Sequence, residues 1–144
     1  MGMFSAIDSA ASGLTAERLR MDVISNNIAN VNTTRTAEGG PYKRQSVVFA
    51  PRSNSKSFTQ MLSNEMDTGD GVRVVGITKD NSPSRLVYEP NHPDANQDGY
   101  VEMPNINIVS EMVDMITATR AYEANVTAVN SAKSMALKAL EIGK

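Results

Sequence analysis

The chain has 144 residues, a formal net charge of −2 and no cysteine. This slightly acidic balance gives no electrostatic reason for binding to nucleic acid or to an anionic membrane surface, and the lack of cysteine excludes disulfide bonds, thiolate catalysis and cysteine-bound metals. Hydrophobic residues make up 40% of the sequence and aromatic residues only 5%, so the chain has little bulk from which to build a large core. We therefore expect a marginal monomer that gains stability by packing against neighbours.

The N-terminal segment contains no proline and carries apolar residues at seven-residue intervals. This spacing predicts a helix over residues 4–29 with one apolar side, as in helices that pack in coiled coils. Gly13 lies inside this helix, where a missing side chain would let a second helix approach closely. The residues of the predicted apolar stripe are Ile7, Leu14, Met21, Ile24, Ile28 and Val31.

A cluster of asparagine residues follows and marks the end of the first helix. Asn and Thr side chains bond to nearby backbone groups and therefore compete with helical hydrogen bonds. We expect the helix to end within this cluster, with its last turn pinned by side-chain amides. The cluster comprises Asn26, Asn27, Asn30 and Asn32, and Thr33 and Thr34 come directly after it.

All six prolines lie between Pro41 and Pro104. Segments rich in Val, Ile, Tyr and Phe within this region predict short strands; they are residues 42–50, 71–78 and 85–89. The stretch 90–104 is dense in Asn, Asp and Pro and is predicted to be a loop. We therefore expect residues 35–104 to form a small, irregular middle region that contains some β structure.

The C-terminal segment is predicted to be a second long helix, from near Asn107 to Ile142. Gly143 comes next and is suited to end a helix. The apolar stripe of this helix also repeats every seven residues. Its members are Ile108, Met115, Tyr122, Val129 and Ala136, supported by Met112, Ala118, Val126 and Leu140.

Together these elements predict a mainly α fold in which two long terminal helices pack as an antiparallel coiled coil, joined by the middle region. The expected divisions are residues 1–34, 35–104 and 105–144. No segment reaches the roughly 18 consecutive apolar residues that span a bilayer, and the N-terminus lacks the apolar run of a secretory signal. These features favour a protein built for assembly over an enzyme.

Three features could suggest a metal site or a catalytic site, and each has a simpler explanation. Residues 94–99 match the opening of a calcium loop, but Asn105 stands where that loop needs a bidentate glutamate. His92 is the only histidine, and no nucleophile motif accompanies it. Met112 and Met115 share a helix face, where methionine ordinarily serves in packing. We expect no cofactor, no metal and no catalytic residue.

The run from Ile24 to Thr33 resembles the N-terminal signature of the flagellar rod, hook and hook-associated protein family. That signature is a small residue, two Asn, an aliphatic residue, Ala-Asn and then Asn-Thr. Its residues in this chain include Asn26, Asn27, Ala29, Asn30, Asn32 and Thr33. Many members continue with Gly-Phe or Gly-Tyr, whereas this chain continues with Thr34-Arg35-Thr36.

Further stretches, which follow one another in the expected order, resemble the proximal rod proteins of this family. They are residues 33–42, 92–101, 104–107 and 112–125. The resemblance thus covers both predicted helices and the loops beside them, and it leaves residues 53–88 without support.

The resemblance implies a structural subunit of the bacterial flagellar basal-body rod, which carries torque from the motor to the hook. Members of this family leave through the flagellar export apparatus without a cleaved signal peptide. They polymerise into a tube whose inner layer is made of paired terminal helices. The implied partners are other rod proteins, copies of the chain itself and the export apparatus. The implied location is the basal body outside the cytoplasmic membrane, in the periplasm or cell wall.

We expect the apolar stripes to form the assembly interface. The predicted interface residues are Ile7, Leu14, Met21, Ile24, Ile28, Val31, Met112, Met115, Tyr122, Val126, Val129 and Leu140. Charged residues beside the stripes, Glu111 and Asp114 among them, are predicted to set the register between neighbouring subunits.

Several alternatives remain at the level of the sequence. A cytoplasmic coiled-coil adaptor could bind a partner helix through the same stripes, and a small hydrolase could use His92. The asparagine side chains either cap the first helix or satisfy buried backbone groups of this chain or of a neighbour.

Overall fold

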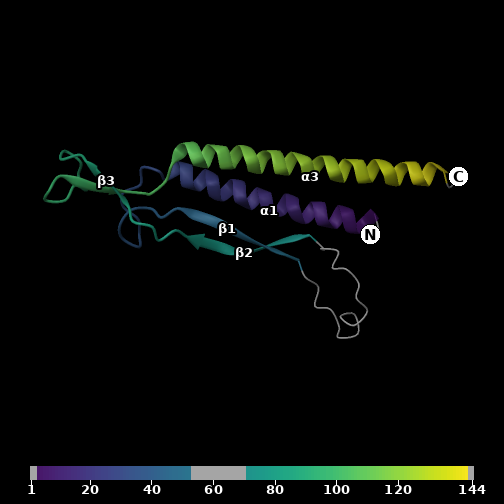
Figure 1. Ribbon diagram of the computed structural model, residues 1–144, viewed down its shortest axis with the longest axis horizontal. Coiled ribbons are helices and arrows are strands. Elements are labelled where there is room, and N and C mark those ends of the chain that lie inside the picture. Colours follow the sequence, from purple (N-terminus) through teal and green to yellow (C-terminus); the bar gives the residue numbers. More distant parts are fainter. Residues whose placement is uncertain (1–2, 53–70, 143–144) are drawn as a thin grey trace, which may run out of the picture.

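The computed structural model describes residues 3–52 and 71–142, apart from the side chains of Met3, Phe4 and Ile142. Its elements are α1 (Met3–Ala29), β1 (Gln45–Pro51), β2 (Val72–Lys79), β3 (Arg85–Tyr88), β4 (Tyr100–Met103) and α3 (Ile108–Ile142). The two helices lie side by side and antiparallel, so both ends of the chain lie at one end of the molecule (Figure 1). Two long terminal helices with a small β-containing region between them confirm the predicted fold class at this level.

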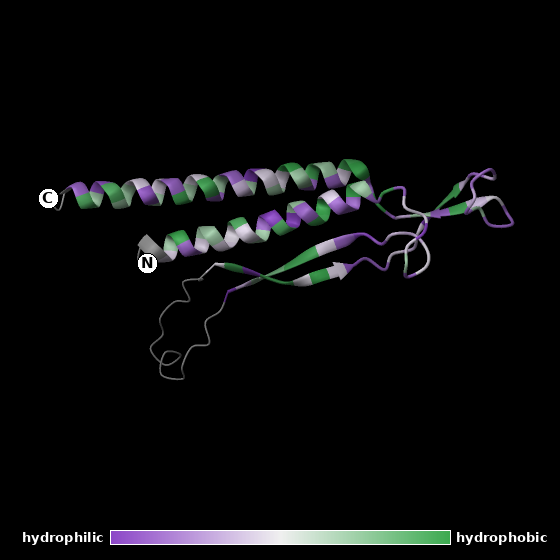
Figure 2. Ribbon diagram, turned by 180° about the vertical axis from the view of Figure 1, so that it is seen from behind, coloured by the Kyte–Doolittle hydropathy of each residue, from purple (hydrophilic) through white to green (hydrophobic). Residues whose placement is uncertain are grey.

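The helices and strands are arranged in layers along the long axis. The hairpin β1–β2 lies beside α1 on the side away from α3, so α1 is the middle layer (Figures 1 and 2). The second hairpin, β3–β4, projects beyond the end of the helix pair (Figure 1). This arrangement leaves α3 with one covered side and a long uncovered side.

Small residues are prominent among the buried apolar residues of the two helices. The buried apolar residues of the pair are Ala10, Ala16, Val23, Ile24, Ala118 and Ala132. A Cβ atom on Gly13 would lie only 2.9 Å from Asn125 Nδ2 on α3, which confirms that this glycine permits close approach of a second helix. Small side chains at such positions allow two helices to pack at short distance.

The seven-residue period recurs in the buried positions of α3, but with a different phase. Glu111, Ala118 and Ala132 are all at most 5% exposed, and they lie on one side of the helix at intervals of seven and fourteen residues. Ile108, which began the predicted stripe, is 45% exposed. The most buried line of α3 therefore starts three residues later than the predicted stripe.

Two antiparallel hairpins make up the middle region. β1 pairs with β2 across a register shift between Val48 and Phe49. β3 pairs with β4, so the predicted loop 90–104 is wrong for Tyr100–Met103. The polar residues around β4 gave no local strand signal, so its pairing with β3 decides the structure there. Val101 in β4 is 0% exposed.

The ends of the helices agree with the sequence where they are described. The first helix ends at Ala29, at the asparagine cluster, and the second begins at Ile108. Gly143, the predicted stop of the second helix, lies outside the described residues. Within the described residues, neither helix combines the length and the hydropathy that crossing a membrane requires.

Candidate functional site

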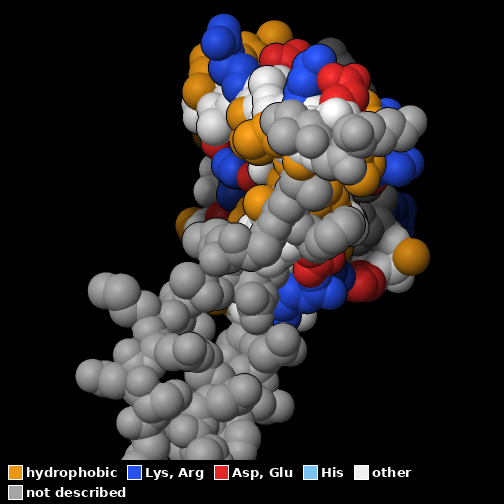
Figure 3. Space-filling view, turned by 90° about the vertical axis from the view of Figure 1, so that its right-hand side faces the viewer, with side chains coloured by type: hydrophobic (Ala, Val, Ile, Leu, Met, Phe, Trp, Pro, Cys, Tyr) orange, Lys and Arg blue, Asp and Glu red, His pale blue; other side chains and the backbone are white. Residues whose placement is uncertain are grey.

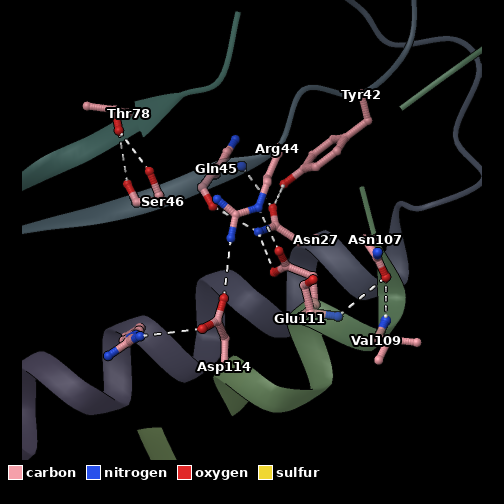
Figure 4. A network of polar contacts seen from close by, with 12 residues as sticks. Asn27, Tyr42, Arg44, Gln45, Ser46, Thr78, Asn107, Val109, Glu111 and Asp114 are labelled. Atoms are coloured by element: carbon pink, nitrogen blue, oxygen red, sulfur yellow. Dashed lines mark hydrogen bonds and ion pairs between the residues drawn. The ribbon is translucent and has the colours of Figure 1, made fainter. Parts of the chain in front are cut away.

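A buried polar network joins the end of α1, the start of β1 and the start of α3 (Figure 4). At its centre is Asn27, which is 0% exposed. Its Nδ2 donates to the Gln45 carbonyl at 2.8 Å and to Glu111 Oε2 at 3.0 Å. Its Oδ1 accepts from the Gln45 backbone nitrogen at 2.9 Å and from the Tyr42 hydroxyl at 3.1 Å. Both donors and both lone pairs of this amide are therefore in use.

Glu111 is the second buried member of this junction network, at 1% exposed. Its Oε1 accepts from Arg44 Nε at 2.6 Å. A buried carboxylate is tolerated when it is paired and hydrogen-bonded, and Arg44 and Asn27 supply both. The expectation that Glu111 sets the register between subunits is therefore wrong for the described chain, because its carboxylate is enclosed within one subunit.

The network extends to the surface through a short row of charges. Arg44 Nη2 lies 3.5 Å from Asp114 Oδ2 on α3, and Arg20 Nη2 on α1 lies 3.8 Å from Asp114 Oδ1. These pairs are partly exposed, so they contribute less to stability than the buried pair does. These charges nevertheless connect both helices to Arg44, the residue directly before β1.

Burial also affects the pKa of Tyr42, whose hydroxyl belongs to the network. Desolvation raises the pKa of Tyr42 above its ordinary value, and the negative charge of Glu111 raises the pKa further. The neutral hydroxyl is the form that donates to Asn27. The junction therefore favours the hydrogen-bonded state of this tyrosine over a wide pH range.

The asparagines of the motif have different roles. Asn30 pins the helix end, because its Nδ2 donates to the Asn26 carbonyl at 2.9 Å and its Oδ1 accepts from Thr33 Oγ1 at 3.1 Å. Asn27 instead satisfies the backbone of Gln45, eighteen residues away. Asn26 and Asn32 are exposed. The predicted capping of the helix end is confirmed at Asn30, and the alternative role, satisfying buried backbone, is found at Asn27.

The predicted interface residues occupy three kinds of position. Ile24 is buried, and Met112 and Leu140 are exposed. The others are partly buried along the helix pair: Ile7, Leu14, Met21, Ile28, Val31, Met115, Tyr122, Val126 and Val129. Their role in assembly stays a prediction, because the structure holds one chain.

A row of exposed apolar side chains covers the first turns of α3. Its members, called here the α3 apolar row, are Ile108, Val109, Met112, Val113 and Ile116, each between 45% and 69% exposed. Glu111 and Ala118 face α1, so the helical period places much of this row on the opposite side. Figure 2 shows the same turns of α3 as strongly hydrophobic. Of this row, only Ile108 and Met112 belong to the apolar stripe predicted from the sequence; the adjacent pairs Ile108-Val109 and Met112-Val113 were the available signal.

The residues that resemble a calcium loop form a turn. Asp94 accepts from Thr34 Oγ1 at 2.8 Å and lies 3.9 Å from Arg35 Nη1. Asn96 Oδ1 accepts from two backbone nitrogens of the same turn, and His92 Nδ1 accepts from the Asp94 nitrogen at 3.1 Å. No group of three or more potential metal ligands occurs among the described residues. Asp94 thus ties the β3–β4 hairpin to the segment after α1.

Comparison with known proteins agrees with this arrangement. Residues 7–35 match the family described as flagella basal body rod protein, and residues 97–142 match the one described as flagellar basal body rod FlgEFG protein C-terminal. The first match contains the motif around Asn27, and the second contains Glu111. The two segments that match these families therefore each contribute one buried residue of the junction network.

Full-length relatives narrow the assignment. The flagellar basal-body rod protein FlgC of Borreliella burgdorferi is 56% identical over 99% of this chain and 98% of its own length. FlgC of Bacillus subtilis is 48% identical over the whole of both chains, and FlgC of Escherichia coli O157:H7 is 38% identical, again over both whole chains. The chain therefore belongs to the FlgC family of flagellar basal-body rod proteins.

Proposed function

We propose that this chain is a structural subunit of the flagellar basal-body rod that assembles through its terminal helices. Its relatives are rod proteins over their full length, and that family is structural and not enzymatic. Its location is accordingly the basal body of the flagellum. The helix pair and the hairpins supply shape and contact surface, and the chemistry of the molecule is complementary packing.

The α3 apolar row is the observation that carries this proposal. Val109 is 69% exposed and Val113 is 57% exposed on a side of α3 that no other described element covers. A contiguous apolar surface of this kind on a small soluble chain usually marks a contact with another protein. Neighbouring subunits in the rod would cover it. A repeated contact between identical subunits that does not close generates a helical assembly.

The helix pair is suited to bear load because its two helices are joined at several levels. The junction network fixes the end of α1 and the start of α3 to β1, and small residues such as Gly13 allow the helices to lie close together further along. The seven-residue spacing of Glu111, Ala118 and Ala132 supports packing as an antiparallel coiled coil. Such a pair would pass torque from the motor towards the hook without sliding of one helix along the other.

Partners follow from the same proposal. They are copies of this chain, other rod proteins and the flagellar export apparatus, through which the subunit leaves the cytoplasm without cleavage. The resemblance of the N-terminal motif supports the export route. By this route the assembled chain would lie outside the cytoplasmic membrane.

The test introduces a charge into the α3 apolar row. Val109→Asp and Val113→Asp place a carboxylate on exposed positions, so the subunit should fold and be exported but should fail to enter rods. Ala128→Asp is the matched control, because Ala128 is exposed on α3 outside the row. Swimming, export and recovery in isolated basal bodies are measured for each. Normal rods in both valine variants would refute assembly through this row, and a chain confined to the cytoplasm would favour the adaptor.

A further inference from the structure

A second exposed surface lies on the β3–β4 hairpin, which projects beyond the end of the helix pair where α3 begins (Figure 1). Tyr88 and Tyr100 are cross-strand partners whose rings meet edge to face, with centroids 5.3 Å apart. Leu86 shares their side of the hairpin, since side chains alternate along a strand. Leu86 is 60%, Tyr88 62% and Tyr100 42% exposed. This aromatic tip is uncovered, whereas the other side of the hairpin holds the buried Val101.

The aromatic tip has an acidic surround. Glu102 lies opposite Leu86 in the register and so on the same side of the hairpin. Glu89 and Asp98 are exposed in the turn beside the two tyrosines. Tyrosine pairs with an acidic rim fit a partner that offers apolar surface together with arginine, because a guanidinium binds both carboxylates and aromatic faces.

The same chain carries such a surface at a distance from the tip. A groove of about 650 Å³ runs between α1 and β2. Leu19, Val72 and Val74 contribute apolar surface to it. Aromatic side chains fill grooves of this size and composition well, since much of their binding energy comes from buried area.

Three arginines line the groove, and they differ in the partners that the described residues give them. Arg52 pairs with Asp8 at 3.1 Å, so its charge is partly neutralised. Arg18 and Arg73 are exposed and have no ion-pair or hydrogen-bond partner among the described residues. Asp22 also lines the groove, which leaves a small positive excess. The groove is thus complementary to the tip in both polarity and charge.

We propose that the aromatic tip of one copy seats in the α1–β2 groove of a second copy of this chain. The inference rests on the proposed function as a rod subunit and names a contact separate from the α3 apolar row. Tip and groove lie at different places along the long axis (Figure 1). When the copies point the same way, as in a rod, one copy is displaced along that axis relative to the next, and the contact repeats without closing. This geometry gives a head-to-tail series, as a rod requires.

Cysteine cross-linking tests the contact directly, because the chain contains no cysteine of its own. Two differently tagged copies are expressed with the wild-type chain, one with Tyr88→Cys and the other with Arg73→Cys. Oxidation of isolated basal bodies should give a disulfide-linked product that carries both tags. Arg85→Cys replaces Tyr88→Cys in the matched control, since Arg85 lies on the other side of the same hairpin. We expect at least tenfold less product from the control pair.

Basal bodies that contain both tagged copies but give no more product than the control would overturn the proposal. Should either cysteine copy fail to enter basal bodies, a charge exchange decides the matter. Glu102→Arg and Arg73→Glu should each reduce swimming, and both changes in one chain should restore at least half of it. Losses that simply add would also overturn the contact. The Val109→Asp result stands in either case, so failure of the tip contact is distinguishable from failure of the rod assignment.

Discussion

The two ends of α3 differ on the side of the helix that faces the rest of the chain: one end is bonded to α1 and to Arg44 beside β1, and the other extends past α1. At its first turns, Glu111 is 1% exposed and bound to Asn27 and Arg44. At its last turns, Met135, Leu137 and Leu140 are between 53% and 71% exposed. Figure 3 shows this end of the molecule with hydrophobic side chains at the surface among charged ones. The difference arises because α3 has 35 residues and α1 only 27, an overhang of about 12 Å.

The two ends differ in whether their contacts lie within the subunit or are left for neighbouring subunits to make. At the junction end, the side of α3 that faces α1 is completed within the chain by directional hydrogen bonds, which tolerate little displacement. The distal end offers apolar surface, which can pack against several partners because the hydrophobic effect is not directional. Rigidity is therefore built on the inner side of the junction end, whereas the α3 apolar row and the distal end offer adaptable contact. Variants at each end should differ accordingly in their effect on the free energy of unfolding.

The largest effect on stability is expected at Asn27. Asn27→Ala removes four hydrogen bonds and leaves the Gln45 backbone and a Glu111 oxygen buried without a partner. We expect a loss of about 2–4 kcal/mol, since each stranded buried polar group costs roughly 1–3 kcal/mol. Urea denaturation of the purified chain measures it.

Asn30→Ala provides the matched control within the same motif. Its amide bonds only to the local helix end, and alanine is the better helix former, so the loss should stay below about 1 kcal/mol. Equal losses in the two variants would mean that the whole cluster acts as a cap and that the junction network adds nothing.

Local sequence signals predicted the helices and failed at the junction, and the reason is physical. Heptad spacing and the asparagine cluster act within one segment, so both helices and the end at Ala29 could be predicted. Asn27 and Glu111 are 84 residues apart, and their contact depends on the complete fold. One signal was available: Glu111 stands seven residues before Ala118, a lone carboxylate on a line of small residues.

The hairpins show the same limit. The first three strands have enough Val, Ile, Tyr and Phe to be predicted from composition. β4 has only four residues among polar neighbours, and its pairing with β3 decides its conformation. The predicted interface had the right period, but the covered and uncovered sides of α3 could be assigned only once α1 was in place.

A smaller effect is expected from the hydroxyl of Tyr42 at high pH. Its pKa in the folded chain is raised above the ordinary 10.0 by burial and by Glu111. As pH rises past about 10, the unfolded chain loses a proton that the folded chain keeps, so the free energy of unfolding falls. Tyr42→Phe should be less stable at neutral pH, because it lacks the bond to Asn27, but its free energy of unfolding should fall less on alkalinisation. Urea midpoints at neutral and alkaline pH measure this difference.

Tyr88→Phe is the control for this pH effect, because Tyr88 is exposed. Its alkaline loss should match that of the unmodified chain. A Tyr42→Phe chain whose stability falls as steeply as that of the unmodified chain would show that this hydroxyl is not held neutral by the junction.

The smallest effect on stability is expected at the distal end, where Leu140 is 71% exposed. Leu140→Gln keeps the helix propensity and removes little buried surface, so the free energy of unfolding should change by less than about 0.5 kcal/mol. Ile24→Gln is the buried counterpart, because Ile24 is only 5% exposed. It buries an amide and should lower the free energy of unfolding by about 2–5 kcal/mol. Rod assembly should nevertheless suffer in Leu140→Gln, because Leu140 belongs to the predicted assembly interface. Thermal unfolding measures the stability of each variant, and the amount of the chain recovered in basal bodies measures its assembly. Unchanged assembly of Leu140→Gln would show that the overhang stays uncovered in the rod.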